Sequence, residues 1–420
     1  MFTKALYNVL TFLFIYLSGN VLLYSQQSKV RYGADVFFEK YYEKISGKRV
    51  GVICNHTSLL SNGVHIVDSL LKKNIDIVAL FSPEHGIRGR VPAGIKVQDQ
   101  TDSITGIKIY SLYGKTLKPT PEMLQGIEVL LFDLQDVGAR FYTYNVTMAY
   151  AMQAAAENKI RFILLDRPNP INGVDVEGPL LDVNLKSAVG FFPIPIRHGL
   201  TLGEIAKMAV GENWIDKNIQ NDLTVIPMEN WKRKMYFDGT KLPWVSPSPN
   251  MKTVSTAVVY PGNCLFEATN ISEGRGTEKP FEYIGAPWID GKLLAKKLND
   301  LKLKGLRFEP IEFTPASDSV TGATPKYANR KCSGIYFKVL DRQKYKPVET
   351  FLYVIQIIQK FYPDSLKYNR NFFDKLIGDK KVLENLNIKN GRKAVEKFSK
   401  VGMEGFKKNA QKYLIYAKNP

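Results

Sequence analysis

Cysteine and histidine are scarce in this chain of 420 residues. Three cysteines are too few for a disulfide framework and allow at most one disulfide. The four histidines show no His-Glu-x-x-His or comparable spacing, so the usual sequence signatures of a zinc site are absent. These residues are Cys54, Cys264 and Cys332, and His56, His65, His85 and His198. Cys54 follows an apolar run, so we expect a small buried hydrophobic side chain there and not a nucleophile.

Several motifs of common enzymes are also missing. The chain has no Gly-x-Ser-x-Gly elbow and no P-loop, and no Gly-x-Gly-x-x-Gly follows the first predicted strand. Gly274-Arg-Gly276 lies far from that strand and lacks the third glycine. We therefore expect no bound dinucleotide and no other cofactor.

Apolar segments long enough to span a bilayer are absent after the N-terminal residues. There, Lys4 precedes an apolar run at residues 9–16, and a second short run ends before Ser25. This layout predicts a signal peptide over residues 1–25 and an exported protein, periplasmic or secreted, without stable membrane insertion after cleavage. An uncleaved anchor is the alternative, because the apolar stretch is near the shortest that can span a bilayer.

The net charge of +18 is unevenly distributed. Residues 1–290 hold 30 basic and 28 acidic residues, whereas residues 291–420 hold 28 and 12. Such a basic balance favours an anionic partner, but export argues against nucleic acid. The excess therefore indicates either a solvated lysine-rich surface or attraction to an anionic cell-wall polymer.

Short apolar runs alternate with helical patterns in the first half of the chain. We predict strands at residues 49–54, 76–81, 106–112, 128–133 and 161–166, and helices at 64–73, 141–158 and 202–210. Strands of continuously apolar residues separated by helices indicate a parallel sheet covered on both faces. The fold class is thus α/β, with a parallel-sheet domain over residues 26–245 that we expect to be catalytic.

The composition of the chain changes near residue 245. A stretch rich in Pro, Gly and Asn covers residues 242–277, and beyond it we predict strands at 306–313 and 334–340 and a helix at 349–361. A lysine-rich helical tail follows. Residues 246–420 are therefore predicted to form a smaller α+β domain that completes a cleft.

Polar clusters follow four of the predicted strands. They are residues 55–58, 82–86, 133–142 and 166–170. The carboxyl ends of parallel strands share one edge of a sheet, where ligands bind, so the clusters are expected to meet there. Taken singly, each is also explained as a polar loop or a helix cap.

Glu84 is the strongest catalytic candidate. Pro83 and Gly86 flank it in a turn that can direct the carboxyl group, and burial can raise the proton affinity of such a group, as a general acid requires. The alternative is a loop glutamate paired with Arg88 or Arg90.

Residues 267–277 form a further polar cluster. Glycines around Arg275 permit close approach of a ligand, and arginine binds carboxylates bidentately. Trp244 and Trp288 are candidate stacking surfaces for a sugar, with core packing as the alternative. A metal site assembled from His56, His85 and Asp133 stays open.

Seven strings carry a resemblance to a known family. They are Phe-Ser-Pro-Glu-His-Gly (81–86), Asp-Leu-Gln-Asp-Val-Gly-Ala-Arg-Phe-Tyr-Thr-Tyr (133–144), Asp-Arg-Pro-Asn-Pro (166–170), Pro-Ile-Arg-His-Gly-Leu-Thr (195–201), Pro-Ser-Pro-Asn (247–250), Ser-Glu-Gly-Arg-Gly-Thr (272–277) and Gly-Ala-Pro-Trp (285–288). The chain resembles the bacterial exo-β-N-acetylmuramidase family over nearly all its mature length. The resemblance implies a Rossmann-like domain joined to a smaller C-terminal domain, and release of N-acetylmuramic acid from the non-reducing end of peptidoglycan fragments. Lys252 and Ala268 depart from the family pattern, where Pro and Gly are usual.

Glycoside cleavage needs an acid, offered by Glu84, and a second group. That group is Asp133, Asp136 or Glu273, or the substrate's own acetamido oxygen. The lactyl carboxylate of muramic acid calls for a cation, offered by Arg275, Arg140 or Arg197. The full set of substrate-binding candidates is Asn55, His85, Arg140, Tyr142, Arg167, Asn169, Arg197, His198, Trp244, Asn250, Arg275 and Trp288. The competing functions are a metal-dependent deacetylase or amidase of the cell wall, and a non-catalytic sugar-binding protein.

Overall fold

The structure is a computed structural model that describes residues 29–88, 98–215, 218–219, 222–317, 324–385, 398 and 402–417. The predicted signal peptide and Arg90 lie outside these residues. Within them, no helix combines the length and the apolar character needed to cross a membrane.

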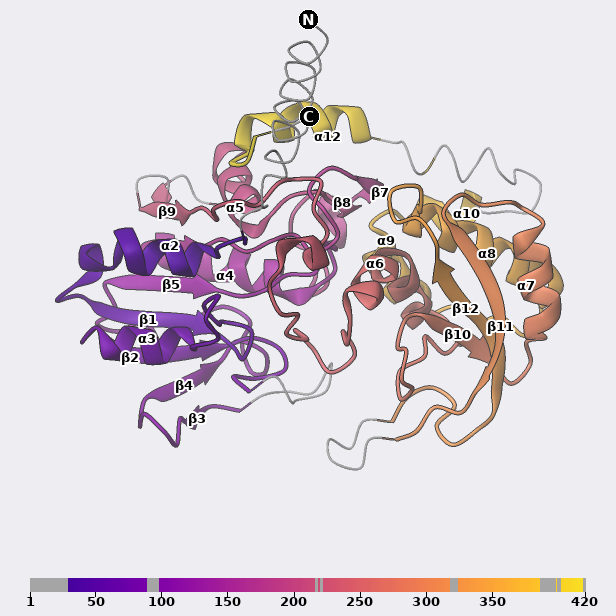
Figure 1. Ribbon diagram of the computed structural model, residues 1–420, viewed down its shortest axis with the longest axis horizontal. Coiled ribbons are helices and arrows are strands. Elements are labelled where there is room, and N and C mark those ends of the chain that lie inside the picture. The colour runs from indigo at the N-terminus through magenta and orange to yellow at the C-terminus, as the bar shows by residue number, and fades with distance from the viewer. Residues whose placement is uncertain are drawn as a thin grey trace, which may run out of the picture.

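A seven-stranded sheet fills the left half of the molecule in Figure 1. Its order is β3-β4-β2-β1-β5-β6-β9, and only the β3–β4 pair is antiparallel. The strands are β1 (Arg49–Cys54), β2 (Asp76–Ser82), β3 (Gln100–Thr101), β4 (Lys108–Ser111), β5 (Val129–Asp133), β6 (Arg161–Leu165) and β9 (Leu223–Ile226). The five predicted strands are confirmed to within two residues at each end. The predictions missed β3, which has two residues, and β9, of which only one residue is buried.

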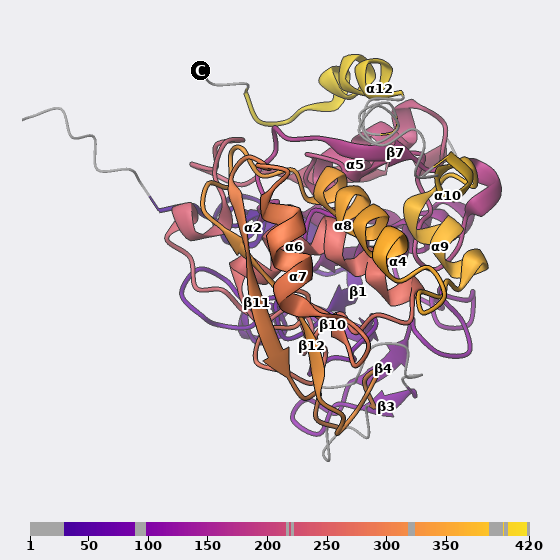
Figure 2. The ribbon, with the colours of Figure 1, turned by 90° about the vertical axis from the view of Figure 1, so that its right-hand side faces the viewer.

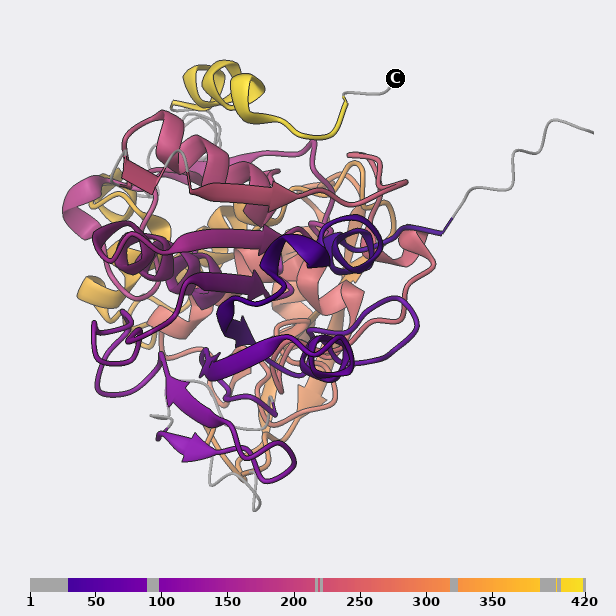
Figure 3. The same ribbon diagram turned by 90° about the vertical axis from the view of Figure 1, so that its left-hand side faces the viewer.

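Helices cover both faces of this sheet, as the continuous apolar runs predicted. In β5, Leu130 and Phe132 join the hydrophobic cluster of α4 and α5, while Val129 and Leu131 join that of α2 and α3. Burying one such side chain stabilises the fold by roughly 1.5–3 kcal/mol. The helices are α2 (Gly33–Lys40), α3 (Ile66–Lys72), α4 (Thr143–Glu157) and α5 (Leu202–Gly211), so the three predicted helices are confirmed. Figure 3 shows the layers from the side of the sheet.

Short elements connect these layers. A two-stranded antiparallel sheet joins β7 (Glu177–Leu180) to β8 (Pro195–Arg197). The 3-10 turns are η1 (Tyr42–Ile45), η2 (Val183–Leu185), η4 (Phe237–Thr240), η5 (Cys264–Ala268) and η6 (Gln411–Tyr413).

The C-terminal part has an antiparallel sheet of order β10-β12-β11. Helices α7 and α8 cover the face that carries Phe308, Ile335 and Phe337 (Figure 2). Its elements are α6 (Val254–Asn263), β10 (Tyr283–Ala286), α7 (Gly291–Asn299), β11 (Leu306–Phe313), β12 (Cys332–Val339), α8 (Pro347–Phe361), α9 (Arg370–Ile377), α10 (Lys381–Asn385) and α12 (Met403–Ala410). The predicted α+β character is confirmed, and with it the fold class.

Helix α6 was hidden within the stretch rich in Pro, Gly and Asn. It contains Pro261 and Gly262, which normally end helices. A Cβ atom on Gly262 would lie 2.1 Å from the carbonyl oxygen of Pro347, so glycine is what permits the close approach of α6 to α8. One hydrophobic cluster runs from α4 through α6 into α8, and the domain boundary near residue 245 stays a prediction.

Arg140 joins the two parts of the molecule. Its side chain is fully buried, and its guanidinium donates to the carbonyl oxygens of Pro179, Ile194 and Leu376 at 2.8–2.9 Å. Leu376 lies on α9, and Gly378 directly follows this helix. A Cβ atom on Gly378 would lie 2.5 Å from Nη2 of Arg140, so only glycine leaves room for the guanidinium there. Burial lowers the pKa of Arg140 to about 9. Both terminal nitrogens of Arg140 donate to backbone oxygens within the fold. A contact between Arg140 and substrate therefore gains no support from the described structure and stays a prediction.

Replacing Arg140 with Met should lower the free energy of unfolding by about 3 kcal/mol or more. Three buried carbonyl groups would lose their donors, and each orphaned group costs about 1–3 kcal/mol, partly offset by removal of a buried charge. Equilibrium urea unfolding measures this loss. The matched control is Arg370→Met. It removes ion pairs of an exposed arginine on α9, the helix that Arg140 contacts, and should lower the free energy of unfolding by less than about 1 kcal/mol. Similar losses in both variants would contradict the joining role of Arg140.

The end of the chain returns to the sheet, where α12 and the residues after it lie beside α5 (Figures 1 and 2). The Tyr416 hydroxyl donates to Asp166 Oδ2 at 2.6 Å, and Asp166 also accepts hydrogen bonds from the Thr201 hydroxyl and the Gly203 amide. Burial raises the pKa of Asp166 to about 6, although these three hydrogen bonds oppose the shift. Since the folded pKa exceeds the unfolded value of about 3.9, the stabilisation that Asp166 supplies at low pH is lost as pH rises through about 6.

Tyr416→Phe should therefore destabilise the protein more at pH 8 than at pH 5. At pH 8 it removes a hydrogen bond to an ionised carboxylate, which contributes about 1.5–3 kcal/mol, whereas at pH 5 the bond to the neutral acid contributes about 1 kcal/mol. Urea unfolding at both pH values measures the difference. Tyr413→Phe, which removes a hydroxyl bonded to Glu212, is the control. An equal loss at both pH values would show that Asp166 does not titrate in this window.

Candidate active site

A cleft of about 820 Å³ lies at the carboxyl ends of β2 and β4, beside the start of α4. Several parts of the chain line the cleft. They include the turn after β2, the 248–252 turn, residues from the 260–277 segment, residues 316–317 and 324–326, and α9. Its polar lining residues include Glu84, His85, Tyr113, Thr143, Asn250, Lys252, Glu267, Glu273, Arg275, Thr277 and Lys326. This is the edge of a parallel sheet at which the sequence predicted a site.

A strained turn holds Glu84 in the cleft. β2 ends at Ser82, and His85 and Gly86 both adopt φ of 73°, a conformation that is uncommon for a non-glycine residue. The turn buries the Glu84 side chain, which is only 7% exposed, and its Oε2 accepts the Thr143 hydroxyl at 2.8 Å. Arg88 forms its ion pair with Asp102. Of the alternative partners proposed for Glu84, Arg88 is thus engaged elsewhere.

Tyr113, which follows β4, lies between carboxylates from the two parts of the molecule. Burial, together with the charge of Glu84 and a hydrogen bond to it, holds the pKa of Tyr113 well above its usual value. The charge of Glu267 contributes to the same shift. The carboxylates of Glu84 and Glu267, one from each part of the molecule, therefore both lie near the Tyr113 hydroxyl.

A chain of alternating charges forms the C-terminal wall. Arg275 bonds Glu267 through Nη2 at 2.5 Å and Glu273 through Nε at 3.3 Å, and Lys326 Nζ lies 2.9 Å from the second oxygen of Glu273. Lys326 also donates to the carbonyl oxygens of residues 266, 267 and 271. Although burial disfavours its charge, the two carboxylates raise the pKa of Arg275. This network fixes the 267–277 segment around two carboxylates.

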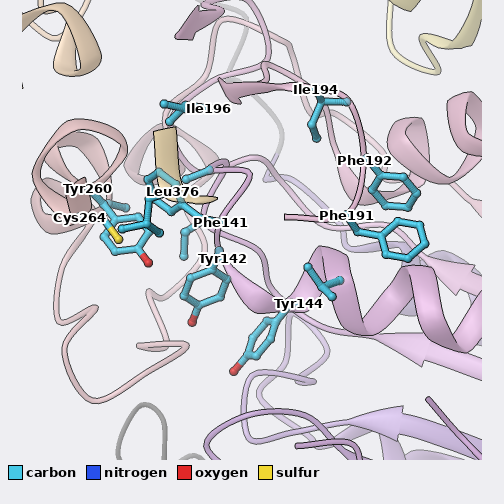
Figure 4. Packing of buried hydrophobic residues seen from close by; sticks show 14 of the residues in the cluster. Phe141, Tyr142, Tyr144, Phe191, Phe192, Ile194, Ile196, Tyr260, Cys264 and Leu376 are labelled. Carbon is cyan, nitrogen blue, oxygen red and sulfur yellow. The ribbon is translucent and has the colours of Figure 1, made fainter. Parts of the chain in front are cut away.

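An apolar wall completes the cleft (Figure 4). The Phe141 ring packs edge-on against Tyr260 with centroids 5.4 Å apart, and Leu376 of α9 lies beside them. Tyr142 belongs to the same wall, and burial raises the pKa of its hydroxyl well above the usual value. Such a wall excludes water from one side of the carboxylates.

The cleft brings together six residues predicted from the sequence, which come from four separate segments. They are Glu84, His85, Tyr142, Asn250, Glu273 and Arg275. Their roles stay predictions, but their convergence is a property of the structure.

Other predicted residues are buried below the cleft. Asp133 is fully buried in a bidentate ion pair with Arg167, at 2.5 and 2.8 Å. The Asn55 amide donates to the Tyr144 hydroxyl, which in turn donates to the carbonyl oxygen of Pro247. These groups are bonded within the fold, so the structure gives no support to substrate contacts of Asn55 and Arg167 or to a catalytic role for Asp133, and these stay predictions.

Four predicted residues from neighbouring loops are likewise bonded within the fold, and their roles stay predictions. Asp136 accepts the Gly138 amide at 2.7 Å and lies 3.7 Å from the buried His198. Asn169 donates to the carbonyl oxygen of Leu200. The buried Arg197 pairs with Asp175 and Glu177, at 3.0 and 3.4 Å. None of these four residues lines the cleft among the residues that the structure describes.

The two tryptophans also lie away from the described lining of the cleft. Trp244 donates to the carbonyl oxygen of Met251 and packs edge-on against Phe237. Trp288 donates to the Tyr327 hydroxyl and packs against Tyr362. Core packing, the alternative reading of both, is what the structure shows.

The sequence reasoning missed Glu267, Tyr113, Thr143 and Lys326 as individual site residues. Glu267 had a usable signal, since it begins the polar cluster that contains Arg275. Tyr113 and Lys326 lie in loops without a distinctive pattern, and only tertiary contacts reveal them.

The geometry gives no support to the metal site considered above. Asp133 directs both oxygens to Arg167, and His56 Nε2 lies 2.7 Å from the carbonyl oxygen of Ser246. Across the described residues, no group of three His, Cys, Asp or Glu side chains is arranged to hold a metal ion. The three cysteines are buried and unpaired, and the expectation for Cys54 is confirmed.

Comparison with known proteins agrees with these features. The family model described as Exo-beta-N-acetylmuramidase NamZ, N-terminal, matches residues 50–255, and its C-terminal counterpart matches residues 258–416. The chain is 46% identical over 398 residues to Peptidoglycan beta-N-acetylmuramidase NamZ of Bacillus subtilis strain 168, covering 93% of this chain and 92% of that protein.

Two crystal structures of DUF1343 family proteins from Bacteroides fragilis have the same fold. One is 37% identical with a TM-score of 0.84, covering 93% of this chain and 99% of its own, and the other is 34% identical with a TM-score of 0.74, covering 93% and 100%. Because both family models and a relative matched along most of its length agree, the chain belongs to the exo-β-N-acetylmuramidase family.

Proposed function

We propose that this protein is a glycoside hydrolase that releases N-acetylmuramic acid from the non-reducing end of peptidoglycan fragments. Family membership supports the assignment. The structural observation that carries it is that Glu84 and the Glu267–Arg275–Glu273 network, which come from the two parts of the molecule, line one cleft. Glycosidases place carboxyl groups on the two sides of the scissile bond in this way.

Glu84 is the general acid in this proposal. Its carboxyl group is nearly buried against the apolar wall, and the Thr143 and Tyr113 hydroxyls fix its orientation. Held there, it donates a proton to the glycosidic oxygen as the bond to the leaving sugar breaks. The strained backbone at His85 and Gly86 is what directs it into the cleft.

The second group comes from the opposite wall or from the substrate. Glu267 and Glu273 line the cleft there, whereas Asp133 and Asp136 are used elsewhere in the fold. The acetamido oxygen of the muramic acid ring is the other source of a nucleophile. In either case Arg275 holds the two carboxylates in place, so we assign it this positioning role and not the recognition of the lactyl carboxylate.

The competing functions lack a supporting observation in the described residues. A metal-dependent deacetylase needs a ligand cluster, and the candidate ligands are used otherwise. A pure binding protein is disfavoured by family membership, because the relative matched over most of its length is named as a β-N-acetylmuramidase.

A disaccharide with N-acetylmuramic acid at its non-reducing end tests the proposal. The wild type should release free N-acetylmuramic acid, and Glu84→Gln should lower turnover by about 10²–10⁴-fold, because the proton donor is lost while the shape is kept. Mass spectrometry identifies the released sugar, and steady-state kinetics measures the rate. The loss should shrink for an aryl glycoside, whose leaving oxygen departs without protonation.

Two controls make this test specific. A thermal melt of the same preparations should show unchanged stability for Glu84→Gln, and Glu157→Gln, which alters an exposed ion pair with Lys118, should keep full turnover. An unchanged turnover number for Glu84→Gln would remove Glu84 from the mechanism. Cleavage of internal bonds alone, without release of the terminal sugar, would overturn the exo-acting assignment.

We also propose that the protein acts after export, in the periplasm or outside the cell. The support is the charged and then apolar pattern of residues 1–25 and the extracytoplasmic location of peptidoglycan. Mass spectrometry of the exported protein should find an N-terminus at Gln26. A chain that keeps residue 1 in the exported fraction would instead favour the membrane anchor.

A further inference from the structure

The cleft opens into a second, shallower groove of about 410 Å³. Lys252, Gly276 and Thr277 line both spaces, so the groove continues from the cleft. Beyond these shared residues the groove is lined by Glu278, Tyr283 and residues 311–314. Any chain that extends out of the cleft past Lys252 enters this groove.

The floor of the groove is the open face of the three-stranded sheet. Tyr283 pairs with Tyr336 across β10 and β12, and Gly285 pairs with Gly334 in the next row on the same face. Both glycines are buried, and the Phe313 ring lies beside the Tyr283 ring with centroids 5.9 Å apart. A Cβ atom on Gly285 would lie 2.9 Å from the Phe313 ring, so a side chain there would disturb the platform.

The platform is rigidly joined to the catalytic wall. Ser272 exchanges two backbone hydrogen bonds with Gly285, at 2.8 and 3.0 Å. The next residue, Glu273, is paired with Arg275, so the same segment belongs to the catalytic wall. The position of the groove relative to the carboxylates is therefore set by backbone hydrogen bonds and not by mobile side chains.

Lys252 differs from the other cations of the cleft. Arg275 and Lys326 are both paired with glutamates, whereas Lys252 Nζ donates to the carbonyl oxygen of Thr277 at 2.9 Å and forms no ion pair with a described residue. Its side chain is exposed at the junction of cleft and groove. An ammonium group in this position is suited to a carboxylate of the ligand.

We propose that the groove is a subsite for the leaving-group end of longer peptidoglycan saccharides. A sugar ring packs against Tyr283, and the lactyl carboxylate of the next muramic acid residue pairs with Lys252. The inference rests on the proposed function: when the terminal sugar occupies the cleft, the rest of the chain must leave it through an opening, and this groove is continuous with the cleft. Apolar ring faces and one cation match the alternating chemistry of such a chain.

Kinetics on two substrates tests the subsite. For the wild type, kcat/KM should be higher for the tetrasaccharide of alternating N-acetylmuramic acid and N-acetylglucosamine than for the corresponding disaccharide. Lys252→Ala and Tyr283→Ala should each lower kcat/KM for the tetrasaccharide about tenfold, mostly through KM, which corresponds to about 1.4 kcal/mol. The loss on the disaccharide should be smaller, so that the ratio of kcat/KM for the tetrasaccharide to kcat/KM for the disaccharide falls in both variants.

Matched variants separate the subsite from general damage. Tyr283→Phe keeps the ring and should behave as the wild type, as should Lys338→Ala, which removes an exposed lysine paired with Glu309 on the same sheet. A tetrasaccharide with N-acetylglucosamine in place of the inner muramic acid should abolish the effect of Lys252→Ala and keep that of Tyr283→Ala.

These experiments distinguish failure of the subsite proposal from failure of the proposed function. If the wild type releases N-acetylmuramic acid from neither substrate, the proposed function itself is wrong. If it cleaves both and the variants leave the ratio of the two kcat/KM values unchanged, the subsite is wrong. An equal loss on both substrates would place Lys252 or Tyr283 at the terminal sugar and would likewise overturn the subsite.

Discussion

One buried guanidinium, that of Arg140, is the constraint on which the cleft depends. It satisfies carbonyl groups from the β7 and β8 region and from α9 at the same time. Since α9 supplies Phe372 and Leu376 to the lining, the shape of the cleft depends on this contact. A charge buried without a carboxylate partner is costly, so it persists only where the acceptors are held rigidly, as backbone carbonyls are. The two parts thus share one interface with little freedom to open, and the hydrophobic cluster that runs from α4 to α8 has the same effect.

The polar edge of the sheet shows why the sequence can predict the position of a site without identifying all the residues that line it. The sequence placed four polar clusters at the carboxyl ends of the strands, and the structure confirms that position. Around β1, β5 and β6, however, many of these polar groups bond to other parts of the fold. Asp133 pairs with Arg167 of the next cluster, and Asp166 accepts a hydrogen bond from Tyr416 near the C-terminus. The cluster after β2 stays at the cleft because its turn carries Glu84 past the end of the strand. Sequence patterns report polarity but not partners, and it is the partners that decide which polar groups are left for a ligand.

The fold was more predictable than the site for a physical reason. Strands and helices follow from the local periodicity of apolar residues, which is why the five strands and the helices α3, α4, α5 and α8 were found from the sequence. Helix α6 was missed because Gly262 is required by a tertiary contact with Pro347, which no local pattern reveals. In the site, Glu84 was found because its turn has a local signature, whereas Tyr113 and Lys326 act only through contacts with distant segments. For Trp244 and Trp288 the sequence could not separate sugar stacking from core packing, because stacking surfaces and core residues have the same composition.

Charge compensation narrows the choice of the second catalytic group. Both oxygens of Glu273 are engaged, Oε1 by Arg275 and Oε2 by Lys326, and the side chain is almost fully buried. Glu267 is held through Oε1 alone in the described structure, and its side chain is 21% exposed to the cleft. A nucleophile or base needs a carboxylate oxygen that can approach the substrate without breaking two ion pairs. In a partly buried wall each broken ion pair leaves an uncompensated charge, which is costly. Of the two glutamates, Glu267 meets this requirement and Glu273 does not. Arg275 then links them: Glu273, itself paired with Lys326, holds the guanidinium, and the guanidinium holds Glu267 in the cleft that Glu84 also lines.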